Sequence, residues 1–207
     1  MSDCIVTFKI QMKKAMWSIL VIVVVVGISL LVVAFKSRDI ETPDYKVVKS
    51  LGDVEIRRYP KMVVAQTSLA SNSFENGGSN GFRTIAGYIF GGNEANQKIA
   101  MTAPVVMNMG DSATMYFVMP KEYSKNQLPT PTSKNVQILE ESEKTLAVIS
   151  YGGFSSDKDI EKYREKLAVA LEQNQIQTKG NYMYMGYNAP WDVVNRRNEV
   201  AIEVILE

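Results

Sequence analysis

The sequence predicts an α+β domain in which two similar units form one curved sheet or distorted barrel flanked by two helices. A transmembrane or signal-anchor helix is expected to precede this domain. Three observations lead to this fold class. An uncharged apolar run lies near the N-terminus, short alternating segments typical of strands surround two segments of helical periodicity, and the second half repeats the element order of the first.

The apolar run covers residues 15–35 and contains 21 residues without a charge. A helix of that length spans a bilayer core of about 30 Å. Three lysines lie shortly before the run, whereas one lysine and one arginine follow it closely. The positive-inside rule then favours a cytoplasmic tail at residues 1–14 and a single-pass membrane protein whose C-terminal domain lies outside the cytoplasm, in the periplasm or extracellular space.

A cleaved signal peptide is the alternative interpretation of this run. Residues 12–14 (MKK) resemble a signal-peptide start, and residues 32–34 (VVA) form a tolerable cleavage site, which would leave a secreted protein. The run exceeds the usual apolar region of a signal peptide, which favours a retained anchor. The true start, Met1 or Met12, stays open. Residues 36–44 are polar, contain Thr-Pro and are interpreted as a linker to a domain over 45–207.

Within that domain, period-two alternation predicts strands and apolar positions at helical spacing predict two helices. The predicted strands lie at residues 54–59, 62–69, 105–109, 114–119, 136–139, 146–151, 182–187 and 199–206, and the predicted helices at residues 82–89 and 157–175. Residues 74–81 are rich in Asn, Gly and Ser, and are interpreted as a loop.

The two halves can be superposed along the sequence with one constant offset. Ala103-Pro104 precedes Ala189-Pro190 by 86 residues, and the strand at 115–119 precedes the segment 201–205 by the same offset. The repeated order predicts duplicated βαββ units related by a pseudo-twofold axis. A cleft between such halves is the natural place for a ligand.

Composition excludes several classes of function. The chain has no histidine, and its single cysteine, Cys4, precedes the apolar run, so His-based triads, histidine metal sites and thiol chemistry in the domain are excluded. Residues 36–207 hold 20 basic and 21 acidic residues, which argues against a nucleic-acid partner. There is no nucleophile–base pair and no cofactor fingerprint, so the sequence favours a binding protein over an enzyme.

Six short motifs, in one order, resemble the SOUL heme-binding family from about Tyr45 to Ile205. They are residues 54–60 (VEIRRYP), 81–91 (GFRTIAGYIFG), 98–105 (KIAMTAPV), 117–120 (FVMP), 187–191 (YNAPW) and 196–200 (RRNEV). The family fold is a pair of βαββ repeats that form a distorted barrel flanked by two helices. The resemblance implies non-covalent binding of heme or another tetrapyrrole in an apolar groove, and hence a carrier, buffer or sensor.

Candidate ligand-binding residues follow from the chemistry of a flat macrocycle that carries carboxylates. Apolar contacts are expected from Ile85, Tyr88, Ile89, Met101, Met107, Met109 and Trp191, with core packing as the alternative for each. Arg83, Arg196 and Arg197 suit carboxylates, although Glu199 is a plausible ion-pair neighbour for one of them. Tyr88, Tyr182, Tyr184 and Tyr187 are possible iron ligands or buried core residues; Tyr187 is included in the predicted site, and no metal site is expected from histidine.

Two further functions stay open at this stage. The duplicated fold also resembles GyrI-like modules that bind apolar or cationic small molecules through an acidic residue in an aromatic cleft. Asp192 beside Trp191 keeps that alternative, and Asp192 also stands where some SOUL members place a basic residue. A membrane-anchored domain that binds a protein partner through an apolar groove is the other alternative.

Overall fold

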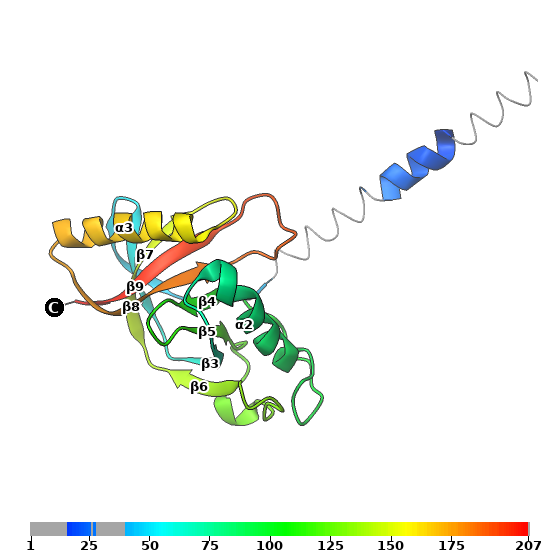
Figure 1. Cartoon of the computed structure of the whole chain (residues 1–207), viewed down its shortest axis with the longest axis horizontal. Coiled ribbons are helices and arrows are strands. Elements are labelled where there is room, and N and C mark those ends of the chain that lie inside the picture. The colour runs from blue at the N-terminus through cyan, green and yellow to red at the C-terminus, as the bar shows by residue number, and fades with distance from the viewer. Residues whose placement is uncertain (1–15, 26, 28–39, 207) are drawn as a thin grey trace, which may run out of the picture. The chain divides into compact units, whose positions relative to one another are not determined.

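The computed structural model describes residues 16–25, 27 and 40–206 of the chain. The chain divides into two compact units, Met1–Ile40 and Glu41–Glu207. The second unit contains the predicted domain and all of the labelled strands and helices (Figure 1).

The first unit overturns the membrane prediction. Among the described residues of this unit, 16–25 and 27 are helical. Within the described ranges, no helix is both long enough and apolar enough to cross a membrane. The predicted single-pass localisation is therefore wrong. The tail at 1–14 and the remaining positions of the predicted span, 15, 26 and 28–35, lie outside the described residues.

The second unit is an α+β domain built on one large antiparallel sheet, as the sequence predicts. The strands are β1 (Lys46–Leu51), β2 (Val54–Tyr59), β3 (Met62–Ser68), β4 (Val105–Asn108), β5 (Thr114–Val118), β6 (Gln137–Glu141), β7 (Lys144–Tyr151), β8 (Gln177–Gly186) and β9 (Asn198–Ile205). The helices are α2 (Phe74–Ile89), α3 (Asp157–Gln173) and the short 3-10 helix η2 (Lys125–Gln127). The strand order in the sheet is β1-β2-β7-β9-β8-β4-β5-β3-β6.

Alternating side chains give this sheet two different apolar faces. On β9, Val200, Ile202 and Val204 join the core beneath α3, whereas Ala201 between them belongs to the core of the opposite face. On β5, Phe117 faces α2 and belongs to the core between α2 and the sheet. Both helices therefore cover one face of the sheet, and the bent sheet packs its other face against itself.

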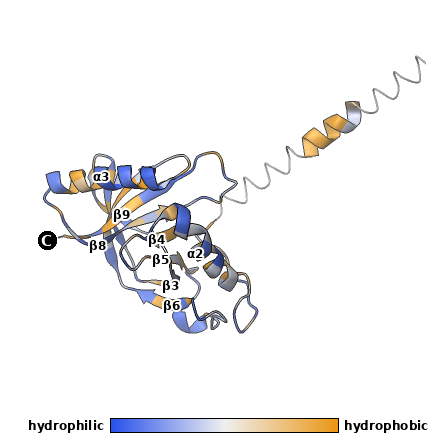
Figure 2. Cartoon of the chain, viewed as in Figure 1, coloured by the Kyte–Doolittle hydropathy of each residue, from blue (hydrophilic) through white to orange (hydrophobic). Residues whose placement is uncertain are grey.

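Helix α3 is amphipathic in the way its sequence predicts. Its buried residues are Ile160, Leu167 and Leu171, which pack on β7, β8 and β9. Figure 2 shows hydrophobic bands along an otherwise hydrophilic α3. Ser156 begins the helix with a capping box, in which its hydroxyl accepts from the Asp159 amide.

Helix α2 begins eight residues earlier than the sequence predicts, so the expected loop over 74–81 is wrong. Ser73 caps the helix by accepting from the Asn76 amide. Asp157 of α3 then accepts from the Phe74 amide at 2.7 Å and from the Ser73 hydroxyl at 2.6 Å. A contact between two helix starts that are distant in sequence thus stabilises a segment whose composition is typical of loops.

The N-terminal approach to the sheet also contacts the domain. The carbonyl of Glu41 accepts from the Ala103 amide at 2.9 Å, and Asp44 forms an ion pair with Lys121 at 2.7 Å. These residues fall within the segment 36–44 that the sequence suggests as a linker. Its positions 36–39 lie outside the described residues.

Candidate functional site

An open groove of about 740 Å³ lies between α2, the β7–α3 loop and the β8–β9 loop, with β4, β5 and β8 beneath it. Its apolar residues are Phe74, Phe82, Val105, Met107, Met115, Phe154 and Pro190. Its polar side chains are Glu75, Ser79, Arg83, Ser155, Tyr184, Asn188 and Arg196. Its volume and mainly apolar wall fit the general description of a small-molecule site.

The wall formed by α2 carries two phenylalanine rings held in place by the sheet. Phe74 and Phe82 are eight residues apart and therefore lie on nearly the same side of the helix. The ring of Phe74 meets Tyr184 edge-on at 4.7 Å between centroids, and the ring of Phe82 is 5.4 Å from that of Phe117. Both rings are thus positioned before any ligand binds.

The floor of the groove offers two thioethers and one phenol. Met107 comes from β4 and Met115 from β5, and Tyr184 comes from β8. The hydroxyl of Tyr184 donates to Asn198 Oδ1 at 2.8 Å. Burial raises the pKa of Tyr184, so its hydroxyl stays protonated at neutral pH. The floor therefore presents neutral atoms to a ligand.

Arg196 lies at the groove wall. Its NH1 donates to the carbonyls of Ala189 at 2.9 Å and Asp192 at 2.6 Å, which closes the turn at 189–192. Its guanidinium lies 4.6 Å from the ring centre of Phe154. Its Nε is buried and has no hydrogen-bond partner in the described part of the chain. Such a donor costs free energy unless an acceptor is supplied.

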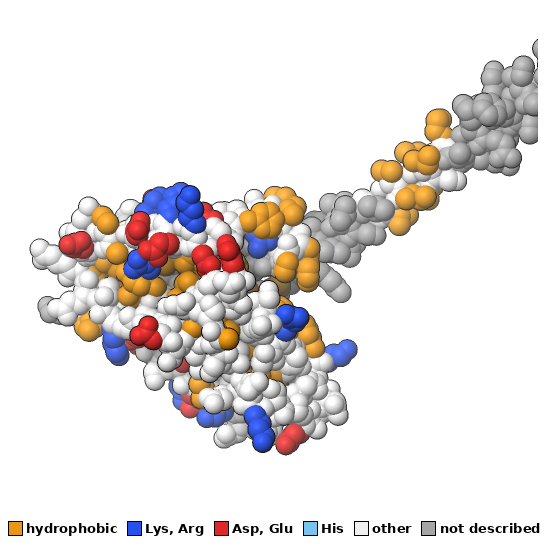
Figure 3. Space-filling model, in the orientation of Figure 1, with side chains coloured by type: hydrophobic (Ala, Val, Ile, Leu, Met, Phe, Trp, Pro, Cys, Tyr) orange, Lys and Arg blue, Asp and Glu red, His pale blue; other side chains and the backbone are white. Residues whose placement is uncertain are grey.

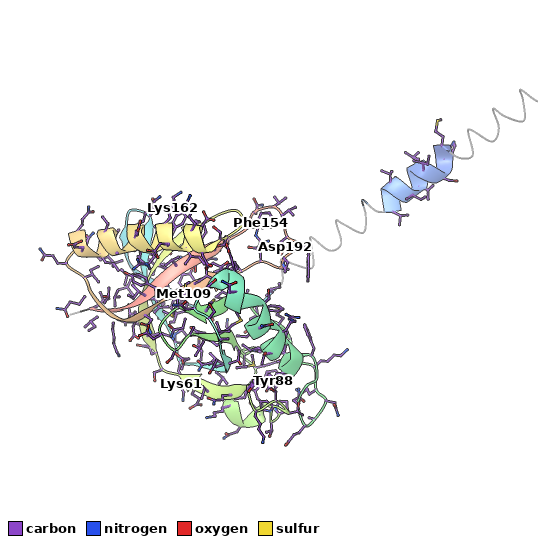
Figure 4. All side chains as sticks on the ribbon, viewed as in Figure 1. Lys61, Tyr88, Met109, Phe154, Lys162 and Asp192 are labelled. Atoms are coloured by element: carbon purple, nitrogen blue, oxygen red, sulfur yellow. The ribbon has the colours of Figure 1, made fainter. Side chains whose placement is uncertain are left out.

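The loops around this groove expose further apolar side chains. Phe154 of the β7–α3 loop and Trp191, Val193 and Val194 of the β8–β9 loop are largely exposed. Figure 3 shows hydrophobic side chains at the end of the domain that holds these loops, and Figure 4 places Phe154 and Asp192 there.

On the other face of the sheet, Glu199 forms the centre of a saturated ionic cluster. Its carboxylate is fully buried and accepts from Arg57 NH1 at 2.9 Å, Arg197 NH2 at 2.7 Å, the Ser150 hydroxyl at 2.8 Å and the Tyr187 hydroxyl at 2.7 Å. Burial alone would raise the pKa of Glu199, but Arg57, Tyr187 and Arg197 outweigh it and hold the pKa below its usual value.

Of the residues that the sequence suggests for the site, the structure brings Arg83, Met107 and Arg196 together in the groove. The others lie elsewhere. Ile85, Tyr88 and Ile89 are buried in the core between α2 and the sheet, and Met101 packs beside them. Met109 packs against the core beneath α3.

Three more suggested residues come from the C-terminal motifs. Tyr187 and Arg197 belong to the cluster around Glu199, where Arg197 also lies 4.2 Å from the ring centre of Tyr187. The side chain of Trp191 is 70% exposed and does not line the groove. Asp192 accepts from the Ala189 amide at 3.1 Å and likewise lies outside the lining.

Sequence reasoning missed most of the aromatic lining of the groove. Phe74 was missed because residues 74–81 have the composition of a loop. Phe74, Gly78 and Phe82 nevertheless follow the four-residue spacing of one helix face. That spacing is the signal which could have found them. Phe154 lies in a loop and carries no local signal for ligand contact, whereas Tyr184 was named from the sequence as a possible iron ligand or a buried core residue.

Comparison with known proteins gives relatives for this whole domain. The model of the SOUL heme-binding protein family matches residues 40–203. Heme-binding protein 2 of Homo sapiens is 31% identical over 174 residues, which cover 78% of this chain and 84% of that protein. Heme-binding protein 1 of Xenopus laevis is 25% identical over 154 residues, with 70% and 80% covered.

Solved structures share the fold at much lower sequence identity. The C-terminal domain of EcmrR superposes with a TM-score of 0.58 at 11% identity and covers 79% of this chain and 99% of that chain. A hydrolase from Listeria innocua has a TM-score of 0.53 at 8% identity, with 80% and 93% covered. These two likenesses show the fold alone. The match over residues 40–203, together with the human relative, shows that this chain belongs to the SOUL heme-binding protein family.

Proposed function

We propose that this protein binds heme or a related tetrapyrrole non-covalently in the groove between α2, the β7–α3 loop and the β8–β9 loop. Family membership supplies the ligand class, and the groove is the apolar concavity that could take it. The proposal assigns binding to the domain after residue 44. It assigns no catalytic step to any residue.

The observation that carries the proposal is an apolar groove with Arg196 at its wall, whose buried Nε has no hydrogen-bond partner among the described residues. A tetrapyrrole with propionate groups would match this site, because its ring is apolar and its carboxylates accept hydrogen bonds. Apolar surface removed from water contributes about 25 cal/mol per Å², so each 100 Å² buried is worth about 2.5 kcal/mol before the costs of binding. A charge-assisted hydrogen bond from Arg196 to a propionate would fix the orientation of the ring in the groove.

The chain has no histidine, so Met107 and Met115 are the groove side chains whose thioethers could hold iron. Both are almost fully buried, so they would contact a bound ring mainly by packing. Tyr184 is a poor candidate because burial keeps it neutral and its proton is donated to Asn198. A bound heme would supply the iron chemistry, whereas these residues hold the ring and shield one of its faces from water.

The open form of the groove favours exchange of ligand over permanent retention, which supports a carrier or buffer role.

The strand order supports the predicted duplication. Without β1, the strand order has β2, β7, β9 and β8 on one side, and β6, β3, β5 and β4 in the matching places on the other. We infer that β2–β5 and β6–β9 are the two halves and that the groove lies where they meet.

Titration of the full-length chain with hemin tests the proposal. We expect a saturable shift of the Soret band at one-to-one stoichiometry, and saturable quenching of the fluorescence of metal-free protoporphyrin IX. Binding of both ligands with similar affinity would indicate that the groove holds the ring without iron coordination. If neither ligand shows saturable binding, the proposed function is wrong.

A further inference from the structure

Three glycines lie in the first half of α2, and two of them are closely approached by the rest of the fold. A Cβ at Gly77 would stand 2.5 Å from the backbone carbonyl oxygen of Ser71, so this position needs glycine. A Cβ at Gly81 would overlap Leu69 Cδ2, so the end of that side chain would have to move.

Gly78 differs from its neighbours because nothing in the fold requires a glycine there. A Cβ at this position would meet only the ring of Phe74, at an ordinary contact distance of 3.7 Å. Its backbone is helical and is not among the glycines with positive φ. Glycine in a helix interior is less stable than alanine, so Gly78 weakens α2 without relieving any steric conflict.

The place of Gly78 in the groove accounts for that cost. It lies four residues after Phe74 and four before Phe82, so the three positions form one stripe on the groove side of α2. The rings on either side are held by Tyr184 and Phe117. Gly78 is itself buried, and of the two rings only Phe74 comes within 4 Å of where its Cβ would stand, so the missing side chain leaves a small notch beside the Phe74 ring on the groove side of α2.

We propose that Gly78 is the specificity-determining residue of the groove, because its missing side chain lets a planar ring system lie against the backbone of α2. This inference rests on the proposed tetrapyrrole binding. It assigns to the notch the flat apolar part of the ligand, and it leaves the carboxylate to Arg196.

The test compares two glycines of the same helix. Gly78→Ala and Gly78→Leu fill the notch by increasing amounts. Gly87→Ala and Gly87→Leu are the matched controls, because Gly87 is exposed, a Cβ there would meet no atom within 4 Å, and the residue does not line the groove. Alanine and leucine are better helix formers than glycine and a Cβ fits at both positions, so thermal unfolding of Gly78→Ala and of both Gly87 variants should shift to equal or higher temperature. Gly78 is buried beside Phe74, so the larger side chain of Gly78→Leu can lower the unfolding temperature by crowding that ring.

Hemin affinity should differ between the two Gly78 variants and the two Gly87 variants. We expect Gly78→Leu to weaken binding at least tenfold and Gly78→Ala to weaken it less, while both Gly87 variants bind as the wild type does. Opposite changes in stability and affinity at position 78 would not result from a merely structural role.

The possible failures are distinct. If the wild type binds hemin and Gly78→Leu binds it equally well, the notch is not used and this inference is overturned, while the proposed function stands. If Gly78→Leu unfolds at a lower temperature, Gly78→Ala decides the matter, and unchanged affinity in that variant overturns the inference. Absence of hemin binding by the wild type overturns the inference together with the proposed function.

Discussion

Arg196 and Arg197 are neighbours in the chain, yet they lie in opposite environments. Arg197 points to the face of the sheet where Glu199 is buried and accepts hydrogen bonds from four residues. Arg196 points to the groove, where its Nε has no partner among the described residues. Both precede the first residue of β9, Asn198, and the path of the chain entering this strand gives them different partners.

The difference separates side chains that satisfy one another from a groove that contains an unsatisfied donor. The cluster around Glu199 is closed, since both carboxylate oxygens are used by neighbours in the chain. The groove is open and mainly apolar, and Arg196 Nε at its wall has no partner in the described part of the chain. A buried charge that is fully hydrogen-bonded supports structure, whereas an unsatisfied buried donor calls for an explanation, which the proposed carboxylate would supply.

The strongest test of the closed cluster is Glu199→Gln. It leaves the buried guanidinium of Arg57 with only the half-exposed Glu55 as a counter-charge, so we expect a loss of about 3 kcal/mol in the free energy of unfolding, measured by urea denaturation. Glu203→Gln on the same strand is the control, because its pair with Lys179 at 3.5 Å is largely exposed and should be worth less than about 1 kcal/mol. Equal losses in both variants would contradict a structural role specific to Glu199.

The same cluster predicts a pH dependence. The pKa of Glu199 is lowered in the folded state, so the stabilisation it provides is present above the ordinary carboxyl value of about 4.3 and is lost as pH falls through the folded value. The difference in unfolding free energy between wild type and Glu199→Gln should therefore be constant above about pH 5 and narrow at lower pH. A difference that stays constant down to about pH 3 would contradict this assignment.

The open groove is tested by Arg196→Gln. Loss of a charge-assisted bond costs about 1.5–3 kcal/mol, so hemin affinity should fall by about ten- to a hundredfold. The sharper measurement uses the dimethyl ester of protoporphyrin IX, which lacks the carboxylates. Wild type should prefer the free acid over the ester, and the variant should lose most of that preference. An unchanged preference would show that Arg196 does not contact the carboxylate.

Arg83→Gln should have the smallest effect. Its guanidinium is exposed and donates to Asn80 Oδ1 at 2.9 Å and to the Ser79 carbonyl within its own helix. Water screens such a charge, so we expect a change in hemin affinity below about fivefold. A loss as large as that of Arg196→Gln would place the carboxylate at α2 instead.

Most strands were predictable from sequence because each has a core on both faces or on alternate residues. The segments 54–59 and 105–109 were predicted as strands on this ground, and the structure has strands at Val54–Tyr59 and Val105–Asn108. Strand β1 was missed because its side chains are mostly exposed. The start of α2 was missed because residues 74–81 have the composition of a loop, and part of what holds its first turn is Asp157, which is 84 residues from Ser73 in the chain. The membrane span was predicted from hydropathy alone, and the described residues form no helix that could serve as one.

The candidate site shows the same division. Sequence identified Arg196 and Met107 by residue type, since guanidinium suits carboxylates and thioethers suit irregular apolar surfaces. It could not separate Ile85, which is buried in the core, from Phe82, which lines the groove three residues away on the same helix. That distinction depends on how α2 is rotated against the sheet.

By itself, the sequence determined the fold class, the family and the absence of histidine chemistry, because local alternation, ordered motifs and composition do not depend on packing. Only the tertiary structure decided which arginine is satisfied and which is not, and which face of α2 meets the groove. Hydrogen-bond partners and helix rotation are set by segments far apart in the chain, so no local pattern records them.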